Sequence, residues 1–161
     1  FYEGLVRVPL IFSWPENFIQ NSQNNALVEM LDLSATLLNL ASVDLPDYLQ
    51  GVSLLPILSG QTKGGEHRDF VRSEYFDALD PHFTGGNGTY ATMHRTRQHK
   101  LCVYHGKGVG ELFDLEQDPW EHNNLWDSPA HSDIKNQLLA ESFDAHVLLT
   151  TDVGSKRIAP M

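Results

Sequence analysis

Long apolar stretches separated by short polar breaks divide the first part of the chain into three predicted elements. Residues Val6–Trp14 are apolar and rich in strand formers, which predicts a buried strand ended by Pro15. Residues Ala26–Ala41 predict a helix, and one short helical turn is expected at Leu54–Leu58. The polar residues of the longer helix recur three or four apart, so we expect one narrow solvent-facing stripe and protein over the remaining surface; the stripe is Glu29, Asp32, Thr36 and Asn39.

The second part of the chain has the shorter apolar period of β-strands. Segments rich in β-branched and aromatic residues predict strands at Phe70–Phe76, Tyr90–Thr96, Lys100–His105 and Leu112–Leu115. Ser128 and Pro129 are typical of a helix start. Apolar residues at four-residue steps predict the helix face that lies across the sheet, namely Leu139, Phe143 and Val147.

These elements predict an α+β chain in two pieces. One strand and one helix are too few for a domain, so residues 1–65 are expected to be the last strand and helix portion of a larger α/β domain. Residues 66–161 are expected to form a small subdomain, an antiparallel sheet packed against a C-terminal helix. The polar segment Gln61–Glu66, which contains two glycines, is the predicted boundary.

Composition and charge narrow the function classes. The 161 residues carry a formal net charge of −10, which argues against a nucleic-acid or anionic-membrane surface. No apolar run is long enough to span a membrane. Residues 81–110 contain no Asp or Glu but several Lys, Arg and His, so this window offers a local place for an anion. The chain starts at Phe1 without a methionine or a targeting segment, and we expect it to be cut from a longer protein.

The run Gly110–Trp126, GELFDLEQDPWEHNNLW, carries the clearest family resemblance. It is similar to the C-terminal sulfatase pattern E-L-[FY]-D-L-x-x-D-P-x-E-x-x-N-L, within the alkaline phosphatase superfamily. Other segments resemble the same family in the same order: Phe1–Ile11, with Leu5 where a second glycine is usual; Leu31–Leu38, with Ala35 in place of proline; Gly51–Gly60; Ser73–Tyr75; and Arg95–Leu101. The resemblance implies a large catalytic α/β domain followed by a smaller α+β subdomain.

The resemblance also implies chemistry that this chain does not carry. Sulfatases use a formylglycine, made from the Cys or Ser of a C/S-x-P-x-R motif, beside a calcium ion. Cys102 is followed by Val-Tyr-His, and Ser13 begins a near match with Asn17 in the arginine position. The family's lysine before Tyr-Glu-Gly would lie upstream of Phe1. We therefore predict no catalytic residue, metal ligand or cofactor in this chain, with calcium and formylglycine supplied by a missing N-terminal part of the sulfatase.

Substrate contacts are the remaining site hypothesis. The candidates lie in the basic window and are His94, Arg95, Arg97 and His105. Arginine forks suit the oxygens of a sulfate ester. Strand alternation places His94 on one side and Arg95 with Arg97 on the other, so all four cannot line one pocket. The competing interpretation is a solvated edge strand whose charges discourage aggregation. The glycine-rich loop Asp77–Gly88 is a further candidate.

Three functions stay open from the sequence. The first is sulfuric ester hydrolysis by the parent enzyme, acting on a sulfated small molecule or glycan; sugar, aryl and choline sulfates are all compatible. The second is phosphomonoester or phosphonate hydrolysis within the same superfamily. The third is a non-enzymatic glycan-binding or oligomerisation module. The apolar segments lack partners, so the isolated chain is expected to expose adhesive surface or to pair with another copy. The family suggests a soluble periplasmic or extracellular protein.

Overall fold

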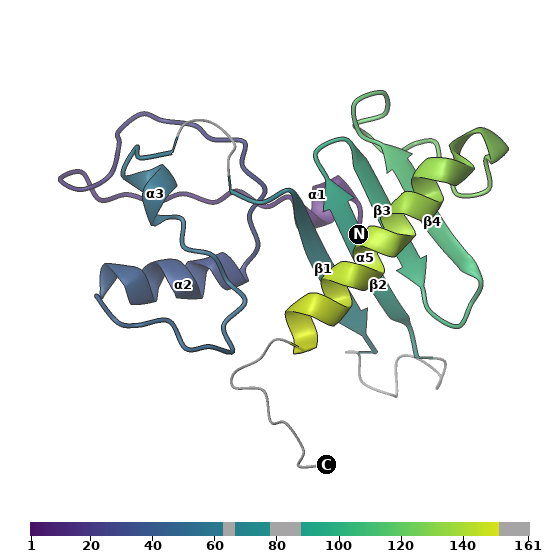
Figure 1. Cartoon of the computed structure of the whole chain (residues 1–161). Helices are drawn as coiled ribbons and strands as arrows, with labels where there is room; N and C mark the ends of the chain where they lie inside the picture. The colour runs from purple at the N-terminus through teal and green to yellow at the C-terminus, as the bar shows by residue number, and fades with distance from the viewer. Residues whose placement is uncertain (63–66, 78–87, 152–161) are drawn as a thin grey trace, which may run out of the picture. The chain divides into compact units, whose positions relative to one another are not determined.

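The computed structural model describes residues 1–62, 67–77 and 88–151 (Figure 1). The chain divides into two compact units, one built from Phe1–Pro9 with Phe70–Ser142 and the other from Leu10–Asp69 with the residues from Phe143 on. The predicted division after residue 65, into the end of a catalytic domain and a small subdomain, stays a prediction. Among the described residues, no helix is both long and apolar enough to cross a bilayer.

The first unit is built on a four-stranded antiparallel sheet. Its strands are β1 (Phe70–Phe76), β2 (Tyr90–Thr96), β3 (His99–Tyr104) and β4 (Val109–Asp114), paired in chain order. Pairing in chain order means that each strand runs antiparallel to its predecessor, and short turns join β2 to β3 and β3 to β4. In the turn after β3, Gly106 and Gly108 have positive φ values of 75° and 68°. The predicted strands and the α+β class are confirmed.

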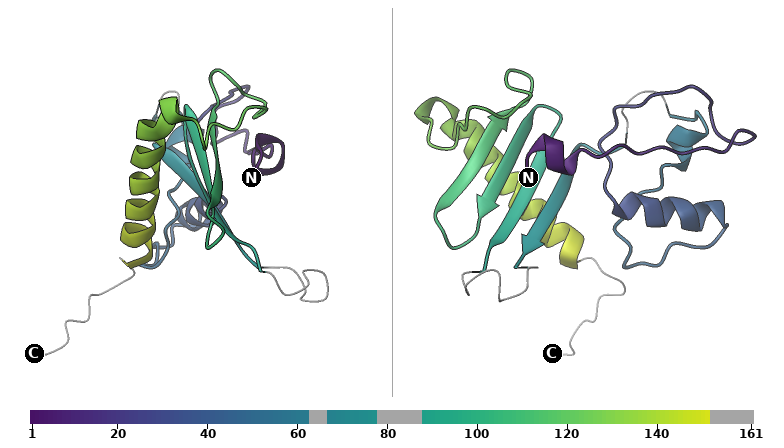
Figure 2. Two further views of the ribbon diagram at one scale, coloured as in Figure 1. Left: turned by 90° about the vertical axis from the view of Figure 1, so that its right-hand side faces the viewer. Right: turned by 180° about the vertical axis from the view of Figure 1, so that it is seen from behind.

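The two faces of this sheet carry different residues. Cross-strand register places Arg72, His94, Leu101 and Leu112 in one row on one face. The adjacent row, on the opposite face, contains Arg95, Lys100 and Phe113. Helix α5 (Ser132–Thr151) runs along the first face, and the short α1 (Glu3–Val6) lies over the second (Figure 2). Both faces of the sheet are therefore used within this unit.

Helix α5 packs on the sheet only partly through the predicted face, since Leu139 does lie against the core. It follows a short helical turn, η1 (Pro129–His131), and Leu138 is buried with Leu101 and Leu112 in the core. Phe143 and Val147, which were expected to face the sheet, are 67% and 37% exposed. The prediction relied on exact four-residue steps, whereas the 3.6-residue period of a helix turns such a row gradually away from the sheet. Leu138 is the buried helix residue that contacts Leu101 and Leu112 of the sheet.

The predicted strand at Val6–Trp14 is wrong. Helix α1 ends at Val6, and the segment that follows has no regular structure. Several of its apolar side chains are exposed: Val8 by 60%, Leu10 by 45%, Ile11 by 87% and Trp14 by 44%. A strand requires a neighbour that supplies ladder hydrogen bonds. No strand among the described residues pairs with this segment, so its apolar composition is not sufficient to make it one.

The second unit contains α2 (Leu31–Leu40) and α3 (Leu55–Leu58). The α2 helix is shorter than expected, and its predicted solvent-facing stripe is wrong, because Asp32 and Thr36 are fully buried. Their oxygens accept hydrogen bonds from the backbone amides of Val52 (2.8 Å) and Leu54 (2.9 Å). The apolar Leu37, in contrast, is 61% exposed. A hydrophobic pattern misses such polar contacts to an irregular backbone.

Close packing at Gly110 gives a test of the first unit. A Cβ atom at this position would run into the six-membered ring of Trp126. We expect Gly110→Ala to lower the free energy of unfolding by about 1–3 kcal/mol, because an overpacked core must shift its neighbours. Gly4→Ala is the matched control, since a Cβ there meets nothing within 4 Å. Urea denaturation of both variants measures the difference, and equal stabilities would contradict this account of Gly110.

Candidate functional site

The end of the run Gly110–Trp126 binds to the backbone of strand β4, where the run begins. The Asn124 amide oxygen accepts from the Leu112 amide (3.0 Å), and its nitrogen donates to the Gly110 carbonyl (3.1 Å). The Leu125 amide donates to the Leu112 carbonyl (2.8 Å). Asn124 and Leu125 thus extend hydrogen bonding along the outer edge of β4. The exposed edge of a sheet can pair with a strand of another chain. Here the edge of β4 is covered by the end of the run Gly110–Trp126.

Lys100 forms the centre of a buried ionic cluster on the sheet face opposite α5. The side chain is fully buried, and its ammonium contacts Glu3 Oε1 (2.7 Å), Glu121 Oε1 (2.7 Å) and the Phe1 carbonyl (2.9 Å). The second carboxylate oxygen of Glu121 accepts from the Glu3 amide (2.6 Å). Three donors of one ammonium thus meet three oxygens, as a buried charge requires. We call this set, with Arg95, the Lys100 cluster.

Arg95 completes the Lys100 cluster from the neighbouring strand. Its Nε and Nη2 atoms donate to the two carboxylate oxygens of Glu3 at 3.0 and 3.2 Å. Burial by itself would raise the pKa of Glu3, but the hydrogen bonds from Arg95 and Lys100 outweigh it and hold that pKa below its ordinary value. Glu3 is therefore ionised, and the cluster contains two cations and two carboxylates. This balance is typical of a structural centre.

A second buried polar centre surrounds Asp32 in the other unit. Its carboxylate accepts from the amides of Glu29 (2.9 Å) and Val52 (2.8 Å), from Arg68 Nε (3.1 Å) and Nη2, and from His67 Nε2 (3.0 Å). Burial tends to raise the pKa of Asp32, yet the Arg68 hydrogen bonds and the backbone amides lower it overall. Both carboxylate oxygens are occupied by protein donors, so Asp32 acts as a structural anchor.

Two of the predicted substrate residues point in opposite directions from β2. His94 faces α5, is 1% exposed and stacks on Phe70 with ring centroids 4.7 Å apart. Arg95 faces the other side and is bound to Glu3. The alternation predicted for these neighbours is what the strand shows. For both residues a substrate role stays a prediction, and Arg95 already has a carboxylate partner.

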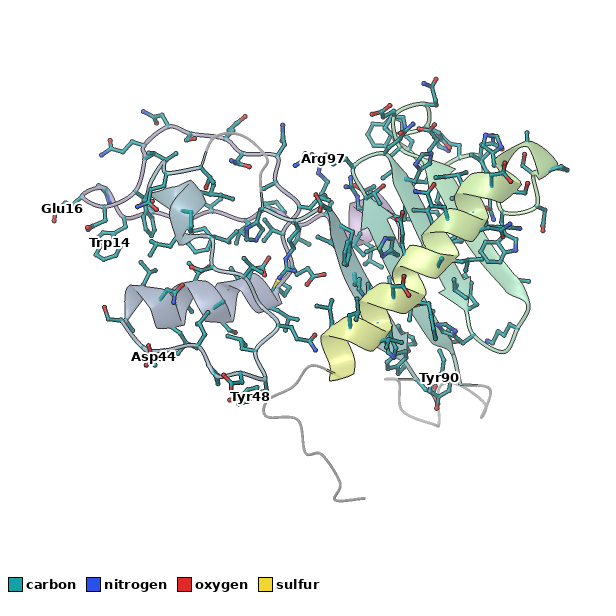
Figure 3. The ribbon with its side chains drawn as sticks, viewed as in Figure 1. Trp14, Glu16, Asp44, Tyr48, Tyr90 and Arg97 are labelled. Carbon is teal, nitrogen blue, oxygen red and sulfur yellow. The ribbon has the colours of Figure 1, made fainter. Side chains whose placement is uncertain are left out.

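The other two predicted residues lie at opposite ends of the β2–β3 hairpin. Arg97 is exposed in the turn that follows β2. His105 is exposed beyond β3, where its Nε2 lies 2.9 Å from Thr92 Oγ1 and its amide donates to the Tyr90 carbonyl. Figure 3 shows Arg97 and Tyr90 at the two ends of the sheet. A strand of this length separates its ends by roughly 20 Å, so these residues do not form one pocket. Most of the candidate loop Asp77–Gly88 lies outside the described residues.

The described residues do not fit the cofactors that sulfatases use. Cys102 is fully buried in β3, and burial with the nearby Glu111 carboxylate raises the pKa of its thiol to about 12, so it is an inert core residue. Within residues 1–62, 67–77 and 88–151 no three His, Cys, Asp or Glu side chains gather where they could hold a metal ion. Cys102 is therefore unsuited to become a formylglycine, and the prediction that this chain holds no catalytic residue stays a prediction.

The sequence did not reveal the central role of Lys100 and Glu121. Lys100 was assigned only to the strand Lys100–His105, and Glu121 only to the run Gly110–Trp126. One signal was present, because strand alternation places Lys100 on the same face as the small, weakly polar Cys102, a residue type that is usually buried. A lysine on an inward face requires acidic partners. Glu121 also has a positive φ of 59°, a strained conformation that its side-chain bonds hold in place.

Comparison with known proteins places these features in a family. Residues 1–146 match the family model of the N-sulphoglucosamine sulphohydrolase C-terminal region. The chain is 32% identical over 136 residues to a Δ4,5-hexuronate-2-O-sulfatase of Bacteroides thetaiotaomicron, covering 83% of this chain and 27% of that protein. It is 34% identical over 164 residues to bovine arylsulfatase A, covering 89% of this chain and 32% of that enzyme. The chain thus spans about a quarter to a third of these relatives.

The fold also occurs in an enzyme that is not named as a sulfatase. The phosphonate monoester hydrolase of Silicibacter pomeroyi superposes with a TM-score of 0.64 at 24% identity, over 79% of this chain and 26% of that one. This likeness shows a shared fold alone. The family match, in contrast, covers most of the chain and agrees with the sequence motifs. The chain belongs to the N-sulphoglucosamine sulphohydrolase C-terminal family and is a sulfatase C-terminal domain of the alkaline phosphatase superfamily.

Proposed function

We propose that this chain is the C-terminal part of a sulfatase that hydrolyses sulfuric esters of sugars or aryl alcohols. In this proposal the nucleophilic formylglycine and a calcium ion are supplied by the rest of the enzyme. The Lys100 cluster is the observation that carries the proposal. It joins three segments that resemble sulfatases, namely the N-terminal Tyr-Glu-Gly, the β2–β3 hairpin and the run ending at Trp126. Motifs far apart in sequence thus meet in one interaction.

The proposed contribution of this domain is to hold its N-terminal segment in place. Phe1 and Glu3 are bound through a backbone carbonyl, a backbone amide and a side chain, all within the Lys100 cluster. In a longer chain these bonds fix the position and direction of the polypeptide that enters the domain. Positional precision of about 1 Å is decisive for catalytic groups. Substrate contacts from Arg97 or His105 remain an additional proposal.

The proposed partner is the N-terminal part of the same enzyme. Large apolar side chains are exposed in the second unit, including Ile11 (87%), Met30 (72%), Leu37 (61%) and Tyr48 (70%). Such exposure is unusual for a stable monomer and typical of a surface that another part covers. Without that part, the chain is expected to self-associate. A nucleic-acid or membrane partner is disfavoured by the acidic charge, and a periplasmic or extracellular location is what the family suggests.

Phosphonate or phosphate ester hydrolysis is the second candidate, favoured by the shared fold of the phosphonate monoester hydrolase. In both reactions the enzyme must stabilise negative charge on oxygens bound to a central sulfur or phosphorus atom. The C-terminal fold therefore does not distinguish the two activities. Rates of the complete enzyme on p-nitrophenyl sulfate and on a phenylphosphonate monoester decide between them. A non-enzymatic glycan-binding module is the third candidate.

The isolated 161-residue chain is expected to show no turnover of p-nitrophenyl sulfate, with or without calcium, because the described residues contain no suitable nucleophile or metal site. The assay compares it with a heat-denatured sample. Turnover above that background would contradict the proposal that the catalytic groups are supplied by the rest of the enzyme. Calorimetry with a sulfated disaccharide completes the test, since micromolar binding by the chain alone would favour the glycan-binding module.

Replacing the central cation should destabilise the sheet unit strongly. In Lys100→Met the carboxylates of Glu3 and Glu121 would remain buried without their shared partner, so we expect a loss of about 3–5 kcal/mol in unfolding free energy. Lys107→Met is the matched control, because Lys107 is an exposed lysine in the turn between β3 and β4 and should change stability by less than about 0.5 kcal/mol. Chemical denaturation measures both. Similar losses would show that burial of Lys100 is unimportant.

Acid should weaken the same cluster in a defined range. The pKa of Glu3 is lower in the folded chain than its ordinary value of 4.5, so the unfolded state binds protons first. The resulting stabilisation is complete above pH 4.5 and is lost as the pH falls through the folded pKa. Melting temperatures between pH 6 and pH 3 measure this loss. Glu3→Gln should be less stable at pH 6 but should lose less on acidification, and an unchanged pH profile would count against the cluster.

A further inference from the structure

His94 occupies an unusual position for an ionisable residue. It lies in the middle of β2, opposite Arg72 of β1 and Leu101 of β3, on the sheet face that α5 covers. Its side chain is 1% exposed, so it belongs to the interface between the sheet and the helix. The ring of Phe70 stacks on one side at 4.7 Å with a 29° angle between the planes. The imidazole is therefore held as an aromatic core residue.

Neither ring nitrogen of His94 has a hydrogen-bond partner among the described residues. A neutral imidazole still carries one N–H group, and burying such a donor unpaired is unfavourable because its hydrogen bond to water is lost without replacement. The nearest acidic group is Glu141 of α5, whose Oε2 lies 3.7 Å from Nε2, beyond hydrogen-bond distance. The other oxygen of Glu141 accepts from Gln137 (2.8 Å) on the same helix. The position thus carries an energetic cost that an apolar residue would avoid.

The charged groups around His94 offset a proton on its ring only in part. On β1, Arg72 adds positive charge, and the carboxylate of Glu74 is paired with that arginine. On β3 and β4, His99 lies 4.0 Å from Asp114 in an adjacent row of the same face. Helix α5 contributes the carboxylate of Glu141, which is 42% exposed and partly solvated. Burial is the largest influence and lowers the pKa of His94, Glu141 opposes it, and Arg72 adds to it.

We propose that His94 is a proton-sensitive latch between the sheet and the first half of α5, closed when the imidazole is neutral and opened by its protonation. Protonation would leave two N–H donors and a full charge in an interface that provides no partner within 3.5 Å. Loosening α5 relieves this by admitting water to the ring nitrogens. The consequence is a domain whose helix cover loosens in mild acid while the Lys100 cluster, on the opposite face, stays intact.

The direction of the pH effect follows from the lowered pKa. The folded state binds a proton at His94 less readily than the unfolded chain, whose histidines titrate near pH 6.5. The stabilisation from neutral His94 is therefore complete above pH 6.5 and is lost as the pH falls from there through the folded pKa. This loss begins at a higher pH than the loss that Glu3 causes, so its onset can be measured separately.

Hydrogen–deuterium exchange of the α5 amides in residues 133–142 tests the latch. The 161-residue chain is compared at pH 7.5 and pH 5.5, with rates corrected for the intrinsic pH dependence of exchange. We expect protection of these amides to fall several-fold at pH 5.5, while the amides of β3 keep their protection. Unchanged protection of α5 between the two pH values would overturn the proposal.

Three variants assign the effect to His94. His94→Leu, which resembles its neighbours Leu101 and Leu112, should abolish the pH dependence of α5 exchange. Glu141→Gln removes the carboxylate that favours the protonated ring, so the loss of protection should begin at a lower pH, and this variant is informative even if His94→Leu does not fold. His105→Gln, a change at an exposed histidine of the same hairpin, should behave like the original chain. A pH response that persists in His94→Leu would refute the latch.

Discussion

The buried ammonium of Lys100 is the interaction on which the sheet unit depends. An unpaired charge cannot remain in a protein interior, so Lys100 requires its carboxylate partners wherever they lie in the sequence. Glu3 comes from the N-terminal segment and Glu121 from the turn after β4. Because one side chain requires both, the N-terminal segment and the turn after β4 are bound to the same strand, β3. The segments that resemble sulfatases therefore contain the residues that this buried charge requires.

The run Gly110–Trp126 also stabilises the fold of the sheet unit. Asn124 takes the place of a neighbouring strand for β4, and Trp126 packs so closely that only glycine fits at position 110. Glu121 adopts a positive φ in order to reach Lys100. None of these residues needs to touch a substrate to be indispensable. They support the sheet and its edge, which is the structural role that we propose for this chain.

The sequence predicted those features that depend on neighbouring residues. The strands of the sheet were located correctly because alternation and turn residues are local signals, as at Tyr90–Thr96. The errors occurred where a distant partner decides. Val6–Trp14 has strand composition but no neighbour to pair with, and Asp32 looked solvated although the backbone at Val52 buries it. The Lys100 cluster was missed for the same reason, since its acidic partners are far away in sequence.

The coupling energy between Lys100 and Glu121 is the most direct test of this account. A double-mutant cycle with Lys100→Met, Glu121→Gln and the double variant isolates their interaction in the unfolding free energy. If Lys100 requires its acidic partners, the double variant is more stable than the sum of the single losses predicts, with a coupling of about 1–3 kcal/mol. Additive losses, with a coupling below about 0.5 kcal/mol, would contradict the central role of this ion pair.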